Sequence, residues 1–304
     1  MTRHFTRDLD ISAAEQLEIL ELAAAMKSAP KDYRNRLDGL TLAMIFQKSS
    51  TRTRVSFETG IGQLGGRGIF LSSKDMQLGR GEPISDTGAV LSRYVDLIMI
   101  RTFAHSDVRD LAAASTVPVI NGLDDTYHPC QILADLQTIR EKKGGTKGVQ
   151  LVYVGDGSNN MAHSLMLGGA LAEMNVRVVA PDGYTPDPAL VAEAAGLGTG
   201  HVEVTDSLDG VDGADVVVTD TWASMGQEEE HAKRLKAFAG YQVDDALMGR
   251  AAQDAIFMHC LPAHRGEEVS VSVIDGPQSV IYDEAENRLH AQKALMAWLV
   301  AQGS

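Results

Sequence analysis

Short apolar runs alternate with longer segments of helical periodicity along the whole chain. The runs lie at residues 41–46, 68–71, 95–100, 117–120, 149–154, 176–180, 202–204, 216–219 and 256–258. Several of them, such as Leu97–Ile100, are apolar at every position, so both faces of the strand have to be buried. A parallel sheet with helices on both faces provides that burial. The alternation therefore predicts an α/β fold in which parallel β-sheets are flanked by helices.

Helices are expected between these strands. The sequence SAAE at residues 12–15 has the pattern of a capping box. It opens a helix whose apolar side is expected to contain Leu17, Leu20 and Ala24. Further helices are expected from residue 51, over 85–94, from 106 and from 129 in the first half, and over 160–174, 189–195 and 283–301 in the second.

A polar, glycine-rich stretch, EKKGGTKG at residues 141–148, separates two halves of this pattern. The helix before it begins at Pro129, and proline suits the first position of a helix. The alternation of strands and helices restarts at Val149. A chain of 304 residues has room for two domains of ordinary size. We therefore expect two domains, with the helix from Pro129 as a connector.

The composition excludes several classes of protein. With 44% hydrophobic and 22% charged residues, the chain is globular rather than disordered. Its net charge of −14 argues against a nucleic-acid surface, so an anionic substrate has to be attracted by local cations. No apolar run reaches the roughly 18 residues of a transmembrane helix, and the N-terminus lacks a signal-peptide core. Only two cysteines occur, Cys130 and Cys260, so we expect a cytoplasmic protein without a disulfide framework.

The most informative polar motif is STRTR at residues 50–54. It follows an apolar strand and precedes Val55, Phe57, Ile61 and Leu64, whose spacing predicts one face of a helix. The motif therefore lies at a helix N-terminus, where unpaired backbone N–H groups and the helix dipole favour an anion. An ordinary N-cap with solvated arginines accounts for only one hydroxyl. The alternation of hydroxyls and guanidiniums favours a site for a phosphate or another oxyanion.

Reactive side chains also follow other predicted strands. Arg101 follows Leu97–Ile100, His128 follows a strand and its loop, and Asp220 and Cys260 follow strands of the second half. Active sites of open parallel sheets lie at the carboxyl ends of the strands. Each residue alone can be read as solvated or capping. Together they predict a site along these strand ends.

A dinucleotide-binding fingerprint is the alternative reading of one segment. Gly155 and Gly157 follow a strand and precede a helix, as such a fingerprint begins. Asn160 stands where the third glycine is expected, and the acidic residue of the fingerprint has no clear counterpart, since Asp182 comes after Pro181. A nicotinamide-dependent dehydrogenase is therefore the second hypothesis, and a non-enzymatic anion-binding module is the third.

The segment His259-Cys260 offers two side chains that can bind a metal. Two candidate ligands in sequence are too few for a zinc site. The nearby side chains His264, Glu267 and Glu268 are expected to be solvated. We therefore predict that the chain uses no metal and no cofactor.

Four motifs resemble those of one enzyme family. They are STRTR at 50–54, HPCQ at 128–131, DTWASMG at 220–226 and HCLP at 259–262. The chain resembles the ornithine carbamoyltransferases of the aspartate/ornithine carbamoyltransferase family over nearly its whole length. In that family the last helix crosses back onto the first domain. The resemblance therefore implies a carbamoyl-phosphate-binding domain of residues 1–143 plus 288–304, an ornithine-binding domain of residues 144–287, and helices that join them.

The resemblance also implies which residues bind carbamoyl phosphate. In the family, the equivalents of Thr53, Arg101 and His128 polarise the carbonyl, and the STRTR hydroxyls and guanidinium hold the phosphate. The implied carbamoyl-phosphate set is Ser50, Thr51, Arg52, Thr53, Gln77, Arg101, His128, Gln131, Cys260, Leu261 and Arg288. Family members have a cis bond between the residues equivalent to Leu261 and Pro262, which turns the leucine carbonyl toward the carbamoyl NH₂. Arg54 ends the motif and is expected to be structural.

The implied ornithine set is Asn160, Asp220, Ser224 and Met225. Asn160 and the Met225 backbone take the substrate carboxylate, Asp220 and Ser224 take the α-amino group, and Cys260 lies near the attacking amine. The implied catalytic residues are Arg101, His128, Asp220 and Cys260. Putrescine or N-acetylornithine are alternative acceptors, but the DTWASMG motif favours free L-ornithine, and aspartate carbamoyltransferases lack it.

The predicted reaction is therefore carbamoyl transfer from carbamoyl phosphate to the δ-amino group of L-ornithine, which gives L-citrulline and phosphate in arginine metabolism. We expect the two substrates to be positioned between the two domains. In the family, the loop containing the equivalent of Gln77 enters a neighbouring subunit's active site. The resemblance thus implies a homotrimer or a multiple of trimers, with no nucleic-acid partner and no membrane.

Overall fold

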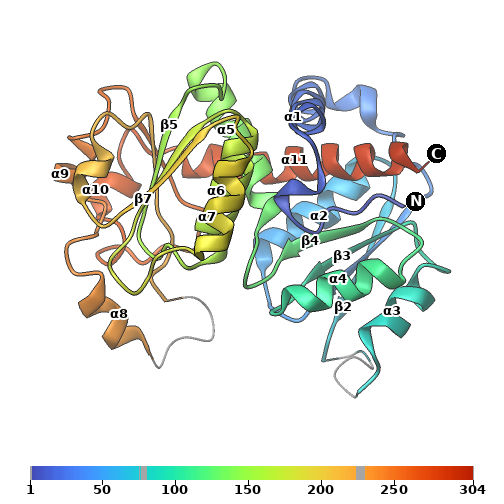
Figure 1. The fold of residues 1–304 in the computed structure, drawn as a ribbon. Helices are drawn as coiled ribbons and strands as arrows, with labels where there is room; N and C mark the ends of the chain where they lie inside the picture. The colour runs from blue at the N-terminus through green and yellow to red at the C-terminus, as the bar shows by residue number, and fades with distance from the viewer. Residues whose placement is uncertain (1, 75, 77–80, 224–229, 304) are drawn as a thin grey trace. The chain divides into compact units, whose positions relative to one another are not determined.

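A computed structural model describes residues 2–74, 76, 81–223 and 230–303 (Figure 1). The chain divides into two compact units. Unit 1 contains Met1–Gln137 and Glu286–Ser304, and unit 2 contains Thr138–Ala285. The two divisions fall inside helices, because α5 spans Pro129–Lys143 and α11 spans Ile281–Gln302. Unit 1 is therefore discontinuous in the sequence.

Unit 1 contains a four-stranded parallel sheet in the order β2-β1-β3-β4. Its strands are β1 (Thr41–Phe46), β2 (Arg67–Ser72), β3 (Leu97–Arg101) and β4 (Val119–Leu123). Every residue of β1, β3 and β4 is buried, and the apolar runs of β1 and β3 predict this burial. The edge strand β2 is partly exposed. On the other edge, Phe5 forms a parallel bridge with Ile120.

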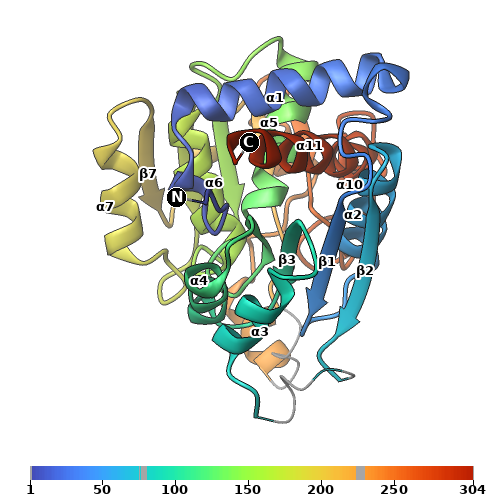
Figure 2. The ribbon, with the colours of Figure 1, turned by 90° about the vertical axis from the view of Figure 1, so that its right-hand side faces the viewer.

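Helices cover both faces of this sheet (Figure 2). They are α1 (Ala13–Ser28), α2 (Thr51–Gln63), α3 (Ile84–Leu91), α4 (His105–Ala114) and the C-terminal part of α11, with short 3₁₀ turns at Asp8–Asp10 and Pro30–Tyr33. Ala43, Ile45 and Ile98 share an apolar core with residues of α3 and α4. α2 lies on the opposite face and contacts α11, since a side chain added at Gly60 would meet Met296.

Unit 2 contains a five-stranded parallel sheet in the order β7-β6-β5-β8-β9. Its strands are β5 (Gln150–Val154), β6 (Asn175–Val179), β7 (His201–Thr205), β8 (Val216–Val218) and β9 (Ile256–Met258). Its helices are α6 (Asn160–Leu171), α7 (Pro188–Gly196), α8 (His231–Ala237), α9 (Asp245–Met248) and α10 (Val271–Ile274), with a 3₁₀ turn η4 at Leu208–Val211. Val152, Val154 and Phe257 form a core with residues of α9 and α10. The α/β architecture with two parallel sheets is thus confirmed.

Some details of the helices differ from the prediction. Leu17 and Val55 are 48% and 55% exposed, so neither belongs to the buried face assigned to it. In α1 the buried residues include Ile19 and Ala23 instead. Ser85 was expected to cap one helix and Ser106 to begin another, but α3 begins at Ile84 after Pro83, and α4 begins at His105 after Ala104. Periodicity limits which residues share a face, whereas the neighbouring elements decide which face is covered.

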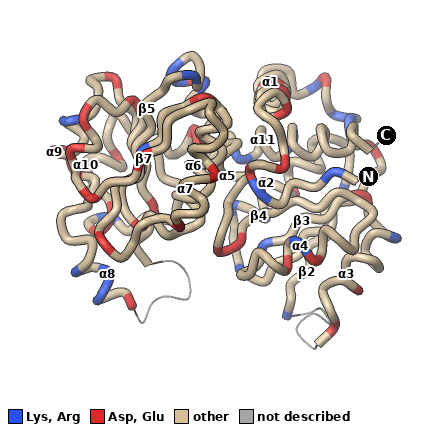
Figure 3. Tube along the Cα trace, viewed as in Figure 1, with Lys and Arg blue, Asp and Glu red and all other residues tan. Residues whose placement is uncertain are grey.

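Charged residues of both signs are interspersed along each unit (Figure 3), and the net charge is −14. Among the described residues, no helix is both long and apolar enough to cross a membrane.

Candidate active site

The turn from β1 to α2 places the STRTR motif at a helix N-terminus, as predicted. Ser50 is the N-cap residue, and its hydroxyl accepts a hydrogen bond from the Thr53 backbone N–H at 3.2 Å. Arg54 has different surroundings, because its guanidinium pairs with Glu58 at 3.3 Å and lies 3.8 Å from the centre of the Phe70 ring. The structure thus separates Arg54, which contacts α2 and β2, from the capped turn.

Thr53 is the centre of a buried polar cluster in unit 1. Its side chain is 1% exposed, and its hydroxyl oxygen lies 3.3 Å from Arg101 Nη1 and 3.4 Å from Arg288 Nη2. Ser50 Oγ is 3.2 Å from the same oxygen. Arg101 is the last residue of β3, and Arg288 lies in α11. The fold of unit 1 thus gathers polar groups from α2, β3 and α11 around one hydroxyl.

Arg288 connects this cluster to α5. Its Nη1 donates to Gln131 Oε1 at 2.7 Å, and its Nε donates to Gln292 Oε1 at 2.8 Å. Gln131 in turn donates from Nε2 to Asp135 at 2.8 Å. These bonds fix the direction of the Arg288 guanidinium. Gln131 and Arg288 were both predicted as site residues, and the structure places them in contact.

His128 precedes α5 and is almost fully buried. Its pKa lies well below the ordinary value, first because burial disfavours the charged ring and then because Arg288, Arg101, Arg52 and Lys48 repel a second proton. The ring is therefore neutral at physiological pH and keeps one N–H donor. A chain with a net charge of −14 thus concentrates four cations around one neutral imidazole, which makes this part of unit 1 suited to an anion.

The loop before His128 depends on a carboxylate that the sequence did not single out. Asp124 is fully buried and accepts hydrogen bonds from the backbone N–H groups of Thr126 and Tyr127, both at 2.7 Å. Asn121 Nδ2 and His105 Nδ1 contact its other oxygen at 2.8 and 2.7 Å. Four partners therefore hold the turn that leads from β4 to His128.

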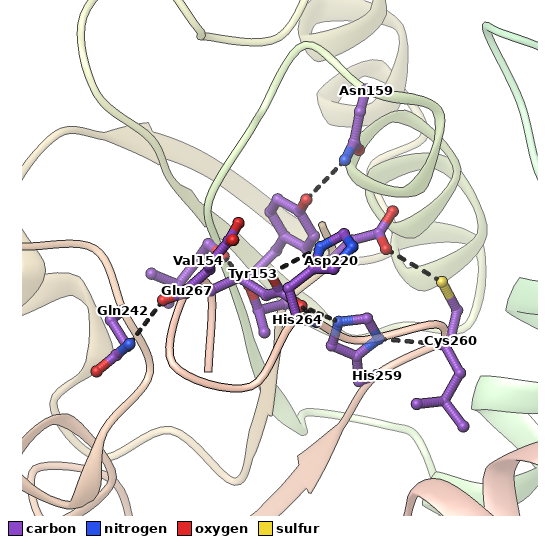
Figure 4. A network of polar contacts seen from close by, with 12 residues as sticks. Tyr153, Val154, Asn159, Asp220, Gln242, His259, Cys260, His264 and Glu267 are labelled. Carbon is purple, nitrogen blue, oxygen red and sulfur yellow. Dashed lines mark hydrogen bonds and ion pairs between the residues drawn. The ribbon is translucent and has the colours of Figure 1, made fainter. Parts of the chain in front are cut away.

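In unit 2, Asp220 and Cys260 are in contact (Figure 4). Cys260 Sγ lies 3.4 Å from Asp220 Oδ1, and Asp220 is 8% exposed. Burial raises the pKa of Asp220, and the nearby His259, the Thr221 backbone and the Cys260 thiol lower it in part. The two residues predicted to serve the attacking amine therefore lie side by side at the ends of β8 and β9.

His259 organises the segment that follows β9. Its Nδ1 accepts a hydrogen bond from the Leu261 backbone N–H at 2.9 Å, and its Nε2 lies 3.2 Å from Glu268 Oε1. Since the carboxylate accepts, Nε2 carries the proton. The bond between Leu261 and Pro262 is cis, as the resemblance predicted, and Leu261 has a φ of 58°. Glu268 is fully buried, so the expectation that it is solvated was wrong.

Asn160 is the first residue of α6, and the preceding Asn159 is its N-cap. Asn159 Oδ1 accepts from the Ala162 backbone N–H at 2.9 Å. Asn159 Nδ2 donates to the hydroxyl of Tyr153 at 2.8 Å (Figure 4). The asparagine pair thus begins α6 after the loop that follows β5, and Asn160 is the residue that the family resemblance assigns to the amino-acid carboxylate.

Arg234 in α8 joins two loops of unit 2. Its Nη1 donates to Asp156 Oδ2 at 2.5 Å and to the Trp222 carbonyl at 2.7 Å. Arg234 and Asp156 are 6% and 3% exposed, so the pair is buried. Asp156 lies in the loop before Asn160, and Trp222 lies in the loop after Asp220. Sequence reasoning missed Arg234, because an arginine in a polar helix has no distinctive spacing.

Three predicted site residues, Gln77, Ser224 and Met225, lie outside the described residues. All other predicted residues of the carbamoyl-phosphate set fall in unit 1 except Cys260 and Leu261, which lie in unit 2 with Asn160 and Asp220.

Both halves of the chain match models of one protein family. Residues 3–141 match the carbamoyl-P binding domain of aspartate/ornithine carbamoyltransferase, and residues 147–299 match its Asp/Orn binding domain. The chain belongs to the aspartate/ornithine carbamoyltransferase family. Family membership excludes the dehydrogenase reading of Gly155 and Gly157.

Individual relatives within the aspartate/ornithine carbamoyltransferase family cover nearly the whole chain. An ornithine carbamoyltransferase from Oceanobacillus iheyensis is 58% identical, over 98% of this chain and 94% of the relative. Among solved structures, ornithine carbamoyltransferase from Pyrococcus furiosus is 52% identical in sequence to this chain, and its fold matches with a TM-score of 0.94. The match covers 98% of this chain and 97% of that chain. An anabolic ornithine carbamoyltransferase from Campylobacter jejuni is 40% identical with a TM-score of 0.93, and covers 99% of this chain and 100% of that chain.

Two clusters of potential metal ligands occur among the described residues. One contains Asp220, His259 and Cys260, and the other contains His264, Glu267 and Glu268. In the first cluster, the Cys260 thiol is hydrogen-bonded to one carboxylate oxygen of Asp220. Both ring nitrogens of His259 also have hydrogen-bond partners, the Leu261 N–H and Glu268.

Proposed function

We propose that the chain transfers the carbamoyl group of carbamoyl phosphate to the δ-amino group of L-ornithine and releases L-citrulline and phosphate. The observation that carries this proposal is the buried cluster of Thr53, Arg101, Arg288, Gln131 and His128, which has the charge and hydrogen-bond donors that carbamoyl phosphate requires. The proposed role is in arginine biosynthesis, because the Campylobacter jejuni relative is described as an anabolic ornithine carbamoyltransferase.

Carbamoyl phosphate is assigned to the domain of residues 1–143 plus 288–304. In the proposal, the N-terminus of α2 with Ser50, Thr51, Arg52 and Thr53 binds the phosphate, because its backbone N–H groups and partial positive charge favour a dianion. Arg288 lies beside Thr53 and extends the positive charge toward the same ligand. Charge-assisted hydrogen bonds of this kind are stronger than neutral ones.

The carbonyl oxygen of the substrate gains negative charge when the amine attacks. Thr53, Arg101 and His128 are proposed to donate hydrogen bonds to it. The lowered pKa of His128 supports this role, because a neutral imidazole can donate one N–H without placing a further cation among four others. Gln131, which Arg288 orients, is proposed to contact the carbamoyl nitrogen. The cluster thus stabilises both the developing oxyanion and the leaving phosphate.

L-Ornithine is assigned to the domain of residues 144–287. Asn160, at the N-terminus of α6, is proposed to bind the α-carboxylate, and Asp220 is proposed to bind the α-amino group. Ser224 and the Met225 backbone belong to the same proposal. No cofactor is needed, because carbamoyl phosphate is already an activated carbamoyl donor.

The attacking amine has to be neutral, although a free alkyl amine has a pKa of about 10. A desolvated site beside Asp220 and Cys260 would orient the amine and favour its neutral form. The Leu261 carbonyl is proposed to accept a hydrogen bond from the carbamoyl NH₂. The rate of carbamoyl transfer is then expected to depend largely on how closely the δ-amine and the carbamoyl carbon are positioned.

Substitution of Arg52 tests the phosphate assignment. Arg52→Ala should raise the KM for carbamoyl phosphate at least tenfold, because a charged hydrogen bond contributes about 1.5–3 kcal/mol. Steady-state rates at saturating L-ornithine give this KM. Arg54→Ala is the matched control: it removes a guanidinium from the same motif, but one that pairs with Glu58, so its effect should be clearly smaller. Equal effects of the two substitutions would contradict the assignment.

The proposal extends to a homotrimer, or a multiple of trimers, in which Gln77 serves a neighbouring subunit, and to a cytoplasmic location. Two free cysteines among the described residues support a reducing compartment. Sedimentation equilibrium measures the number of chains directly, and a monomer would contradict the role proposed for Gln77.

A further inference from the structure

Tyr153 is a fully buried phenol in the middle of the unit 2 sheet. It lies on β5, which pairs with β6 on one side and β8 on the other. Its neighbours Val152 and Val154 belong to the apolar core on one face of the sheet. Because side chains alternate along a strand, Tyr153 lies on the opposite face. Figure 4 shows its hydroxyl directed toward Asn159.

The hydroxyl of Tyr153 is not needed for packing, since phenylalanine would fill almost the same volume. Burying a hydroxyl is unfavourable unless it forms a hydrogen bond. Within the part of the chain that the structure describes, the phenolic oxygen has one such partner, Asn159 Nδ2 at 2.8 Å. The contact with Asn159 is therefore the interaction that distinguishes tyrosine from phenylalanine at this position.

That contact holds the Asn159 amide at its NH₂ end. With Nδ2 bonded to Tyr153, Oδ1 faces the Ala162 backbone N–H at 2.9 Å and caps α6. A reversed amide would place its NH₂ group against that N–H and lose the capping bond, whereas the phenol, which can also donate, would still bond to Oδ1. The Ala162 N–H thus sets which way the amide faces, and the Tyr153 hydroxyl anchors the other end of the amide beside the helix N-terminus, on which Asn160 is the first residue.

We propose that Tyr153 is a positioning residue for the amino-acid substrate: through the Asn159 amide, it holds the N-terminus of α6 in the arrangement in which Asn160 binds the α-carboxylate. This inference rests on the proposed function of Asn160. Tyr153 acts on binding of the amino acid and has no role toward carbamoyl phosphate, whose proposed ligands on α2, β3 and α11 lie in unit 1.

The electrostatic surroundings keep the hydroxyl protonated. Burial raises the pKa of Tyr153 well above its ordinary value, and the negative charges of Asp220 and Asp156 raise it further. The neutral phenol therefore persists over the pH range of an activity assay, and a pH change within that range leaves the contact intact.

Tyr153→Phe removes only the hydroxyl and tests the proposal. The KM for L-ornithine should rise about five- to thirtyfold, the size of effect expected when a partly buried hydrogen bond is lost and the Asn159 NH₂ group loses its partner. The kcat and the KM for carbamoyl phosphate should stay within about threefold. Calorimetric binding of L-norvaline, which has the α-carboxylate and α-amino group but no δ-amine, should weaken in parallel. Tyr241→Phe is the matched control, because the Tyr241 hydroxyl donates to Asp206 O in an exposed contact.

A double-mutant cycle tests whether Tyr153 acts through Asn159. Asn159→Ser keeps a capping oxygen but has no amide N–H for Tyr153. It should itself raise the KM for L-ornithine, and adding Tyr153→Phe should cause little further change. Additive effects would overturn the proposed route. Asn159→Ser also provides the readout if Tyr153→Phe does not fold.

The remaining outcomes separate this inference from the proposed function. If Tyr153→Phe leaves the KM for L-ornithine within twofold while Asn160→Ala raises it, the inference is wrong and the proposed function stands. If Asn160→Ala has no effect on L-ornithine binding, the contact on which the inference rests is wrong. A Tyr153→Phe variant that loses affinity equally for both substrates would indicate a merely structural role and would also overturn the inference.

Discussion

At the scale of single residues, the negative charge of Asp220 is buried, and this burial lowers the stability of the folded state. Its carboxyl is 8% exposed, and burial raises its pKa despite the nearby His259, Thr221 backbone and Cys260 thiol. Buried charges that lack a strong partner disfavour the folded state. The proposed contact with a substrate amino group supplies the missing cation only when L-ornithine is bound. Asp220 therefore illustrates a site residue whose role opposes stability.

Asp220→Asn is expected to lower activity and raise stability in a pH-dependent manner. The folded pKa of Asp220 lies above the unfolded value, so the folded state binds more protons and stability falls as pH rises through that window. Asp220→Asn has no carboxyl group at this position, so its stability does not fall with rising pH for this reason. Its melting temperature should exceed that of the wild type at pH 8, with the gain disappearing near pH 4, while kcat/KM for L-ornithine falls about 10- to 100-fold. Thermal unfolding at both pH values checks this. An equal gain at pH 4 and pH 8 would exclude charge burial as its cause.

At the scale of elements, helix starts were predicted best where a side chain caps the helix. Ser12 and Ser50 were placed correctly because each hydroxyl accepts a backbone N–H bond within its own helix. Ser85 and Ser106 have the same residue type, yet each is the second residue of its helix. A serine near a predicted helix start is therefore compatible with two positions. Local sequence distinguishes them only when a second signal, such as Glu15 in the capping box, is present.

Ser12→Ala should measure the contribution of the capping box of α1. The Ser12 hydroxyl accepts from the Glu15 N–H at 3.3 Å, and Glu15 accepts from the Ser12 N–H at 2.7 Å. Loss of the cap should lower the free energy of unfolding by about 1 kcal/mol in urea denaturation. Ser28→Ala, at the other end of the helix, removes only an exposed bond to Ala25 O and should change it less. Equal changes would mean that helix propensity, not the cap, is responsible.

At the scale of the whole molecule, the last residues of the chain belong to the first unit. Residues 286–304 belong to unit 1, and Ala291, Leu295 and Met296 of α11 are fully buried. Arg288 of the same helix completes the polar cluster around Thr53. Residues 286–304 therefore contribute to both the core and the proposed carbamoyl-phosphate site of unit 1.

A chain that ends at Ala285 should lose the native structure of unit 1 and keep that of unit 2. The truncation removes Trp298 and leaves Trp222 as the single tryptophan, which is 5% exposed in unit 2. Trp222 emission should stay blue-shifted and show a cooperative urea transition, while circular dichroism shows a loss of helix. Full-length Trp298→Phe supplies the reference spectrum. Red-shifted Trp222 emission before any urea is added would show that unit 2 cannot fold without unit 1.

The sequence alone determined the fold class, the family and the candidate groups at the strand ends. Continuous apolar runs such as β3 cannot be solvated on either face, which requires a covered parallel sheet. The STRTR motif needs only its own turn to form a capped helix start, so Ser50 and Thr53 could be placed from local sequence. Both inferences rest on interactions within a few residues or on the period of a single element.

Only the tertiary structure decided which partners these groups have. Thr53, Arg101 and Arg288 come from three elements far apart in the sequence, and no local pattern predicts that they share one hydroxyl. Burial of Glu268 and the contact between Tyr153 and Asn159 likewise depend on how strands and loops pack. The physical reason is that burial and long-range hydrogen bonds are properties of assembled neighbours, whereas periodicity and capping are properties of the chain itself.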